Sequence, residues 1–382
     1  EQELDLQLSL GMAWMGDIPS PEWGKTYARA RELCQHTEKT AQLCHVLGHL
    51  AIYHYVRGEY QQARAIAEEA LTLAQESQDP VLEILEHWHL GFILFGIGEF
   101  ISAHAHLQKV ISFYEPQKHH PQFLRLWGSD PGVSAQAYDA CCLWCLGYPD
   151  QAAQVGLRAI ALADDFDHAF TLADVEAFAG CLLNEMRRDA PALKISAEKL
   201  IHLSQAIGFL TWFGTGTCYV GEALVIDGQY GEGIAWIQRG KSFRLDRGAR
   251  CYLSGTLGLL AEAQKEANSL AEGLIAISEA LAFVEETGER HQEAELYRLQ
   301  GTFLQAQGKR DEAEASLRRA IETARNQQAK SWELRTAISL ARLWQKQGKL
   351  DEAKQLLAPI YGWFTEGFDT PDLNAARELL QT

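Results

Sequence analysis

Two stretches near one end of the chain decide the fold: LYRLQGTFLQAQGKRDEAEASLRRAIETA at residues 296–324 and LRTAISLARLWQKQGKLDEAKQLLAPI at residues 334–360. Each has a small residue within an apolar helical pattern, a glycine seven residues later, and a second small residue five positions after that glycine. Small residues let two helices approach closely, and the glycine supplies the left-handed conformation that ends the first helix. Each stretch is therefore predicted to form a helical hairpin.

The same columns recur through most of the chain with a period of about 40 residues. The small residue of the first helix falls at Ala51, Gly91, Ala140, Cys181, Gly221, Ala261, Gly301 and Ala341. The turn residue falls at Gly58, Gly98, Gly147, Arg188, Gly228, Asn268, Gly308 and Gly348. The small or apolar residue of the second helix falls at Ala63, Ala103, Ala152, Leu193, Gly233, Gly273, Ala313 and Ala353. The step between first-column residues is 40 in five cases. It is 49 between Gly91 and Ala140 and 41 between Ala140 and Cys181.

These columns predict an all-α, right-handed α-solenoid of about nine helical hairpins followed by a capping helix. We expect one superhelical domain over residues 1–382. It would comprise an N-terminal repeat (1–39), eight repeats (40–358) with an insertion at about 115–132, and a C-terminal cap (359–382).

The columns resemble the tetratricopeptide repeat, which has small residues at its eighth and twentieth positions and glycine between them. The longer period is similar to that of the repeat regions of bacterial STAND-type signalling ATPases and of predicted ATPase/nucleotide-cyclase fusion proteins. The resemblance rests on segments such as GSDPGVSAQAYDACCLWCLGYPDQA (128–152) and VEETGERHQEAELYRLQG (284–301). It implies a sensor or scaffold segment whose ATPase and effector domains lie N-terminal to it in a parent chain. The absence of an initiator methionine agrees with this expectation.

Composition excludes several classes of partner. A net charge of −17 disfavours nucleic acid, since phosphate binding needs clustered Lys and Arg, and it disfavours anionic membrane surfaces as well. No apolar window is long enough to span a bilayer. The eight cysteines have no disulfide-framework spacing and are predicted to be reduced core residues, so the cytoplasm is the expected location.

No catalytic or cofactor motif has the context that its chemistry requires. AWIQRGKS (235–242) formally matches a relaxed phosphate loop, but it falls within a predicted helix and lacks the preceding strand. The C-x-x-C pair at Cys142 and Cys145 also lies in a predicted helix, without a second ligand pair for zinc. His45 and His49 are one helical turn apart and could share a metal, but surface or groove histidines are the default interpretation. We therefore expect a protein that is not an enzyme and has no cofactor or metal.

The concave groove of such an array is the expected binding surface. In the tetratricopeptide pattern, the groove positions predict a groove that is aromatic in repeats two to five and charged from repeat six onward. The expected insertion between the third and fourth repeats could fold over this groove as a lid, or it could be only a packed loop. The candidate binding residues are Tyr55, Trp88, His89, Phe92, Arg125, Asp130, Tyr138, Trp144, Glu222 and Glu262.

Two functional hypotheses follow. The first is a non-catalytic sensor of a larger bacterial signalling protein that binds a protein, a peptide or a small-molecule inducer in the groove. The second is a purely structural interaction scaffold that could self-associate through YGWFTEGF (361–368).

Overall fold

The computed structural model describes residues 2–34 and 40–381, and this part of the chain contains helices and no strand. Residues 1 and 35–39 of the expected N-terminal repeat, and residue 382 of the expected cap, lie outside it. The elements up to the fifth hairpin are α1 (Gln2–Ala13), η1 (Met15–Asp17), α2 (Pro21–Cys34), α3 (Thr40–Val56), α4 (Tyr60–Ser77), α5 (Pro80–Gly96), α6 (Phe100–Phe113), α7 (Pro116–Trp127), α8 (Pro131–Leu146), α9 (Pro149–Phe166), α10 (Ala169–Val175), η2 (Glu176–Leu182), α11 (Leu183–Arg187) and α12 (Ala190–Ile207). The later elements are α13 (Leu210–Ile226), α14 (Tyr230–Leu245), α15 (Leu253–Glu266), α16 (Leu270–Thr287), α17 (Glu293–Ala306), α18 (Arg310–Asn326), α19 (Lys330–Lys346), α20 (Leu350–Tyr361) and α21 (Pro371–Gln381).

The predicted helical-hairpin superhelix is confirmed. Each first-column residue lies in the first helix of a pair, and the pairs are α3/α4, α5/α6, α8/α9, α10–η2–α11/α12, α13/α14, α15/α16, α17/α18 and α19/α20. An additional pair, α1/α2, precedes them, and α21 is the predicted final helix. That residues 1–382 make up a single domain remains a prediction.

The turn column ends the first helices as expected. All eight of its residues have positive φ, from 59° to 96°, including the two that are not glycine, Arg188 and Asn268. The small column brings the paired helices together: a Cβ added to Gly91 would lie 2.5 Å from Leu107 on the partner helix. The local geometry of each repeat therefore follows from its own sequence.

The insertion is a helix and not a loop. Pro116 occupies the first turn of α7, and Gly128 ends the helix with a φ of 80°. His119, Phe123 and Trp127 are buried and four residues apart, so they form one apolar stripe. After α7, the Asp130 side chain accepts hydrogen bonds from the N–H groups of Gly132 and Val133, which confirms the predicted start of α8.

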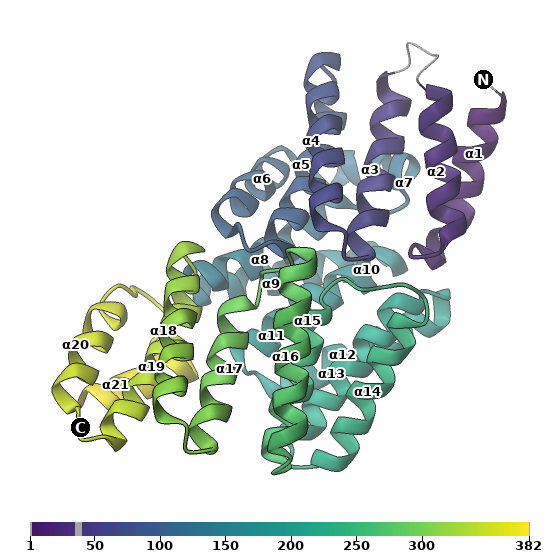
Figure 1. Cartoon of the computed structure of the whole chain (residues 1–382). Helices are drawn as coiled ribbons and strands as arrows, with labels where there is room; N and C mark the ends of the chain where they lie inside the picture. Colours follow the sequence, from purple (N-terminus) through teal and green to yellow (C-terminus); the bar gives the residue numbers. More distant parts are fainter. Residues whose placement is uncertain (1, 35–39, 382) are drawn as a thin grey trace.

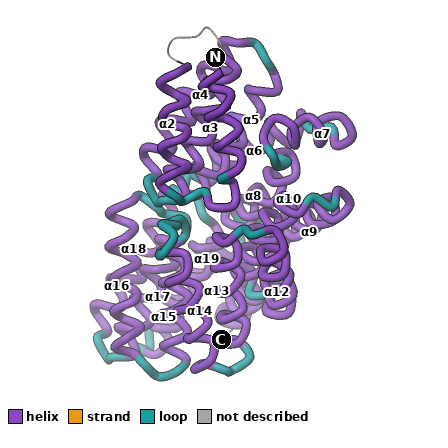
Figure 2. The backbone as a smooth tube through the Cα atoms, turned by 90° about the vertical axis from the view of Figure 1, so that its right-hand side faces the viewer, coloured by secondary structure: helices purple, strands orange, loops and turns teal. Residues whose placement is uncertain are grey.

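The superhelix turns tightly enough for its second turn to contact its first. Figure 1 shows α1–α7 above α12–α16 with α8 and α10 between them, and Figure 2 shows loops between the two tiers. The amides of Arg250 and Cys251 donate to the Val56 carbonyl at 2.8 and 3.0 Å. The amides of Arg290 and His291 donate to the Gly96 carbonyl at 2.9 and 3.2 Å. Each contact joins a hairpin turn to an inter-repeat loop about five repeats further along the chain.

A buried carboxylate strengthens the junction between the turns. Glu289 accepts hydrogen bonds from the Tyr60 hydroxyl on α4, from the Tyr252 amide at 2.5 Å, and from both the amide and the hydroxyl of Ser254. The Ser331 hydroxyl donates to the Trp144 carbonyl at 2.5 Å. These hydrogen bonds hold the second superhelical turn against the first, so the second turn covers the concave face of the early repeats. Among the described residues, no helix is both long enough and apolar enough to cross a membrane.

Candidate functional site

The contact between the two superhelical turns encloses a cavity against the concave face of the early repeats. The cavity holds about 1320 Å³ of space between protein atoms, including open solvent at its mouth. Several of its wall residues, among them Ile18, Phe170, Phe209 and Thr211, are only partly buried. A cavity of this kind is the usual setting for a ligand site.

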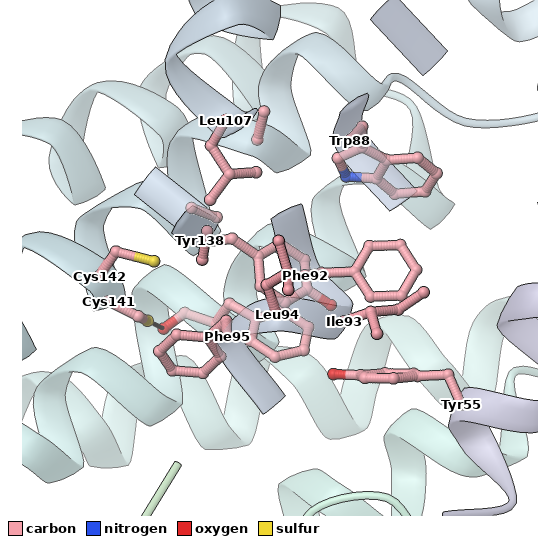
Figure 3. Close-up of a cluster of buried hydrophobic side chains, with 14 of the residues drawn as sticks. Tyr55, Trp88, Phe92, Ile93, Leu94, Phe95, Leu107, Tyr138, Cys141 and Cys142 are labelled. Carbon is pink, nitrogen blue, oxygen red and sulfur yellow. Dashed lines mark hydrogen bonds between the residues drawn. The ribbon is translucent and has the colours of Figure 1, made fainter. Parts of the chain in front are cut away.

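Twelve of the 32 residues that line the cavity are Phe, Trp or Tyr. They come from both superhelical turns: Trp23, Tyr55, Trp88, Phe92, Trp127, Tyr138, Phe170, Phe178, Phe209, Trp212, Tyr219 and Tyr252. The rings of Phe92 and Tyr138 are 5.6 Å apart, and Tyr55 meets Phe92 at 4.8 Å (Figure 3). The hydroxyls of Tyr55 and Tyr252 are hydrogen-bonded at 2.5 Å, and this pair links the first turn to the second across the cavity.

One wall of the cavity is built by an irregular helix. The first helix of the fifth hairpin runs as α10, widens into the π-helix η2, and continues as α11. Phe170, Asp174, Phe178, Leu182 and Glu185 of this helix all line the cavity. They recur at intervals of three or four residues, so one face of the helix supplies a ladder of cavity contacts. Wide turns of this kind often occur at functional sites.

The one-residue excess between Ala140 and Cys181 is the sequence signal of this wide turn. The hairpin turn at Arg188 follows the preceding left-handed residue, Asp167, by 21 positions, whereas Gly98 follows Gln78 by 20. The additional residue therefore lies within the α10–η2–α11 helix.

Asp174 is the polar group at the centre of this wall. Its side chain lines the cavity with only 6% of the residue exposed, and its Oδ2 atom has no hydrogen-bond partner within the described chain. Burial raises the pKa of this carboxyl to about 6, against a smaller opposing effect of the Ser134 hydroxyl. Among the described residues, no basic side chain lies within ion-pair distance of it.

The other ionisable groups on the wall are either neutral or held by the protein. Burial lowers the pKa of His291 to about 3 and that of His49 well below its usual value. Arg244 donates to the Thr256 hydroxyl at 3.2 Å and to the Cys251 carbonyl. Glu185 accepts a hydrogen bond from the Gln292 side chain at 3.2 Å, and burial raises its pKa to about 8.

Four of the residues selected from the sequence meet at this cavity. Tyr55, Trp88, Phe92 and Tyr138 all line it, and each is 5% exposed or less. The positions of Tyr55, Trp88 and Phe92 follow from the groove stripe of the repeat, because that stripe is the concave face that the second turn covers. Tyr138 is not in that stripe and was selected as one of the polar groups of the expected site.

The residues selected around the insertion occupy other positions. His89 is fully buried beside Trp127, and its Nδ1 atom lies 2.7 Å from Glu86 Oε2. Arg125 is exposed on α7 and does not line the cavity. Asp130 is fully buried, where it caps α8 and accepts from the Tyr114 hydroxyl at 2.5 Å. The insertion reaches the cavity through Trp127 and the following serine, so it contributes to the wall.

The three remaining candidates lie further along the superhelix. Trp144 packs on Trp332 at 4.8 Å, in the contact between the turns and outside the aromatic cavity. Glu222 and Glu262 are half-buried in the later repeats, and Glu262 lies 3.9 Å from the Arg298 guanidinium. Neither glutamate lines the cavity, although both act electrostatically on Glu185, which does.

Sequence reasoning missed the half of the wall that comes from the second turn. Asp174, Tyr252 and His291 were not selected, although the two last residues lie in loops that meet the first turn. Asp174 lies one position before the first groove column of its repeat, on the irregular helix that lines the cavity. Cys141, Cys142 and Cys145 are fully buried core residues, as predicted.

Comparisons with known proteins support the repeat assignment. Residues 43–77 and 301–326 match one sequence model of the tetratricopeptide repeat, and residues 334–359 match another. These matches fall on hairpins α3/α4, α17/α18 and α19/α20, so the chain carries tetratricopeptide repeats. No curated protein matches the chain in sequence.

Several solved structures are similar to the chain. The Rap conjugation gene regulator of plasmid pLS20, in complex with the Phr* peptide, matches at a TM-score of 0.57 and 13% identity over 86% of this chain and 95% of that chain. The apo quorum sensor NprR from B. thuringiensis matches at 0.50 and 12% over 94% and 98%. A STAND protein with a tetratricopeptide repeat sensor from Pyrococcus horikoshii matches at 0.44 and 13%, over 94% of this chain and 55% of that protein. At these identities the first two show a shared fold, and the third supports no further argument.

Proposed function

We propose that this chain is a non-catalytic sensor that binds a ligand or peptide inside its superhelix. The observation that carries the proposal is the aromatic cavity enclosed between the two turns, which combines a large apolar wall with a few buried polar atoms. This composition is typical of ligand sites, in which apolar surface supplies affinity and a few polar groups set orientation.

The two similar folds support a regulatory role. One is a gene regulator in complex with a peptide, and the other is a quorum sensor. A superhelix of paired helices is thus compatible with ligand-responsive regulation. The binding residues that we propose for this chain are Tyr55, Trp88, Phe92 and Tyr138, because they share one cavity.

The cavity offers a physical route from binding to signalling. Tyr55 belongs to the first turn and Tyr252 to the second, and a ligand between them contacts both. A ligand that prefers one spacing of the turns shifts the superhelix toward that spacing. In the proposed parent, a bacterial STAND-type ATPase in the cytoplasm, this change would act on the N-terminal switch domain. A parent reading frame without a nucleotide-binding domain on that side would contradict this part of the proposal.

A cavity-filling variant tests the binding site. Thr215 lines the cavity and is half-buried, so Thr215→Trp places a large ring in it. The matched control is Thr72→Trp on the exposed surface of α4. We would screen peptides and small metabolites by thermal shift against the wild type and both variants. The proposal expects compounds that stabilise the wild type and the Thr72 variant but not the Thr215 variant. Compounds that still stabilise the Thr215 variant would place binding elsewhere.

The scaffold hypothesis has less support from the structure. Trp363 and Phe368 are partly exposed, at 38% and 42%, but Trp363 packs against Tyr148 at 5.7 Å and beneath the Lys330 ammonium. The backbone amide of Gly367 also donates to Asp150 at 2.9 Å. Most of this segment therefore joins the two superhelical turns and is not presented as a free patch.

A further inference from the structure

The Asp174 carboxylate differs from the other buried aspartates in the described part of the chain, Asp130 and Asp139. Asp130 caps α8 and also accepts from a tyrosine. Asp139 contacts His104 Nδ1 at 2.6 Å and accepts from the Gln108 side chain at 2.7 Å. These two carboxylates are thus satisfied by the protein itself, whereas Oδ2 of Asp174 has no partner within the described chain.

Aromatic residues line the cavity together with Asp174, whose Oδ2 atom has no hydrogen-bond partner in the described chain. Phe170 and Phe178 lie one helical turn before and after Asp174, and all three side chains line the cavity. The Phe178 ring meets Tyr138 at 3.9 Å and Tyr252 at 5.6 Å. Aromatic faces attract cations, and a buried carboxylate oxygen without a partner favours a positively charged hydrogen-bond donor.

The other ionisable groups on the wall do not pair with Asp174. Arg244 is fixed by Thr256 and the Cys251 carbonyl, and Glu185 is bonded to Gln292. The two wall histidines, His49 and His291, are neutral because burial lowers the pKa of each. The overall charge of −17 also draws cations toward the protein in preference to anions.

We propose that the cavity binds a small organic amine, with its N–H group on Asp174 and its apolar, ring-bearing body among Phe178, Tyr138 and Tyr252. This inference rests on the proposed sensor function and specifies its ligand class. The amine supplies the donor that Asp174 lacks, and the rings cover the carbon skeleton. Only non-covalent contacts form, so the protein returns unchanged when the ligand leaves.

Two probes of equal shape test the inference. 2-Phenylethylamine carries the ammonium, and 2-phenylethanol replaces it with a neutral hydroxyl. Because Trp88, Trp127 and Trp212 line the cavity, their fluorescence reports binding when it is excited beyond the absorption of the phenyl ring. Calorimetry provides an independent dissociation constant. A charge-assisted hydrogen bond predicts that the amine binds roughly ten- to hundredfold more tightly than the alcohol.

Variants test whether Asp174 causes the preference for the amine over the alcohol. Asp174→Asn is nearly isosteric and should abolish the preference for the amine while the alcohol still binds. Asp139→Asn, at a buried aspartate outside the cavity, should leave the preference unchanged. Thr215→Trp should block both probes, and circular dichroism verifies that each variant is folded.

The outcomes separate this inference from the broader proposal. Any one of three results would overturn the amine inference. The wild type could bind both probes with equal affinity, it could bind neither probe, or the preference for the amine could survive in the Asp174 variant. The sensor proposal would still stand if another compound from the screen bound the wild type and failed to bind the Thr215 variant. If every bound compound also bound the Thr215 variant, the sensor proposal itself would fail.

Discussion

Replacing Asp174 by asparagine should stabilise the ligand-free protein at neutral pH, although it alters a proposed binding residue. Burial raises the pKa of the carboxyl from its ordinary value of 3.8 to about 6. A raised acid pKa means that the folded state holds the proton more tightly than the unfolded chain does. Stability from this group is therefore complete below about pH 4, falls as the pH rises toward about 6, and then stays level.

The size of the effect follows from the shift. A difference of about two pKa units, at about 1.4 kcal/mol per unit, corresponds to about 3 kcal/mol of unfolding free energy. Asparagine does not titrate, so the unfolding free energy of the variant should rise by this amount relative to that of the wild type between acid and neutral pH. In a chain of this length, 1 kcal/mol moves the melting temperature by roughly 1–2 °C, which predicts a relative gain of roughly 3–6 °C.

The assay is a series of melting curves of the wild type and the variant from pH 4 to pH 8, compared at each pH. Every other titrating group is common to both proteins, so the pH dependence of the difference isolates Asp174. Asp139→Asn is the control with the opposite sign, because it weakens the contacts of a partnered carboxylate with His104 and Gln108 and should lower the melting temperature at neutral pH. The difference in melting temperature between the Asp174 variant and the wild type should grow with rising pH. The reasoning would be refuted if that difference were constant across this range or fell with rising pH.

Two further substitutions test the contact between the superhelical turns and the packing next to the insertion. Tyr60→Phe removes a hydrogen bond to the buried Glu289 and should cost about 1.5–3 kcal/mol, with faster hydrogen exchange in the α14–α15 loop. Tyr53→Phe, whose hydroxyl has no hydrogen bond within the described chain, should change neither quantity, and equal effects of both variants would contradict this role. Gly132→Ala would place a Cβ 2.1 Å from the Tyr114 ring and should lower the melting temperature, at a cost of about 1–3 kcal/mol. Gly231→Ala, with open space around it on α14, should be neutral or stabilise by up to about 1 kcal/mol, and a melting temperature of the Gly132 variant equal to that of the wild type would contradict the packing argument.

The features that the sequence predicts are those that one repeat determines by itself. The turn column predicts left-handed residues even at Arg188 and Asn268, where glycine is absent. The groove column selects Tyr55 and Phe92, which lie on the cavity wall. In each case the information is contained within a single hairpin.

The features that the sequence does not predict depend on distant contacts or on local irregularity. Closure of the cavity requires loops about five repeats apart to meet, and no pattern within a repeat encodes that distance. The insertion was expected to be a loop, either a lid or a packed loop, yet Pro116 starts a helix and Pro121 is accommodated inside it. The stripe of His119, Phe123 and Trp127 was the available signal for that helix.

The cavity wall carries a cost that a bound ligand can offset. Asp174 Oδ2, Trp88 Nε1, Trp23 Nε1 and both ring nitrogens of His291 are buried without a hydrogen-bond partner in the described chain. A buried polar atom that makes no hydrogen bond costs about 1–3 kcal/mol, and apolar residues of similar shape would avoid that cost. The surrounding hydrogen bonds between the two turns hold these atoms in place although they lack partners. A ligand that bonds to them gains what the protein alone does not, and its binding therefore stabilises the closed arrangement of the two turns.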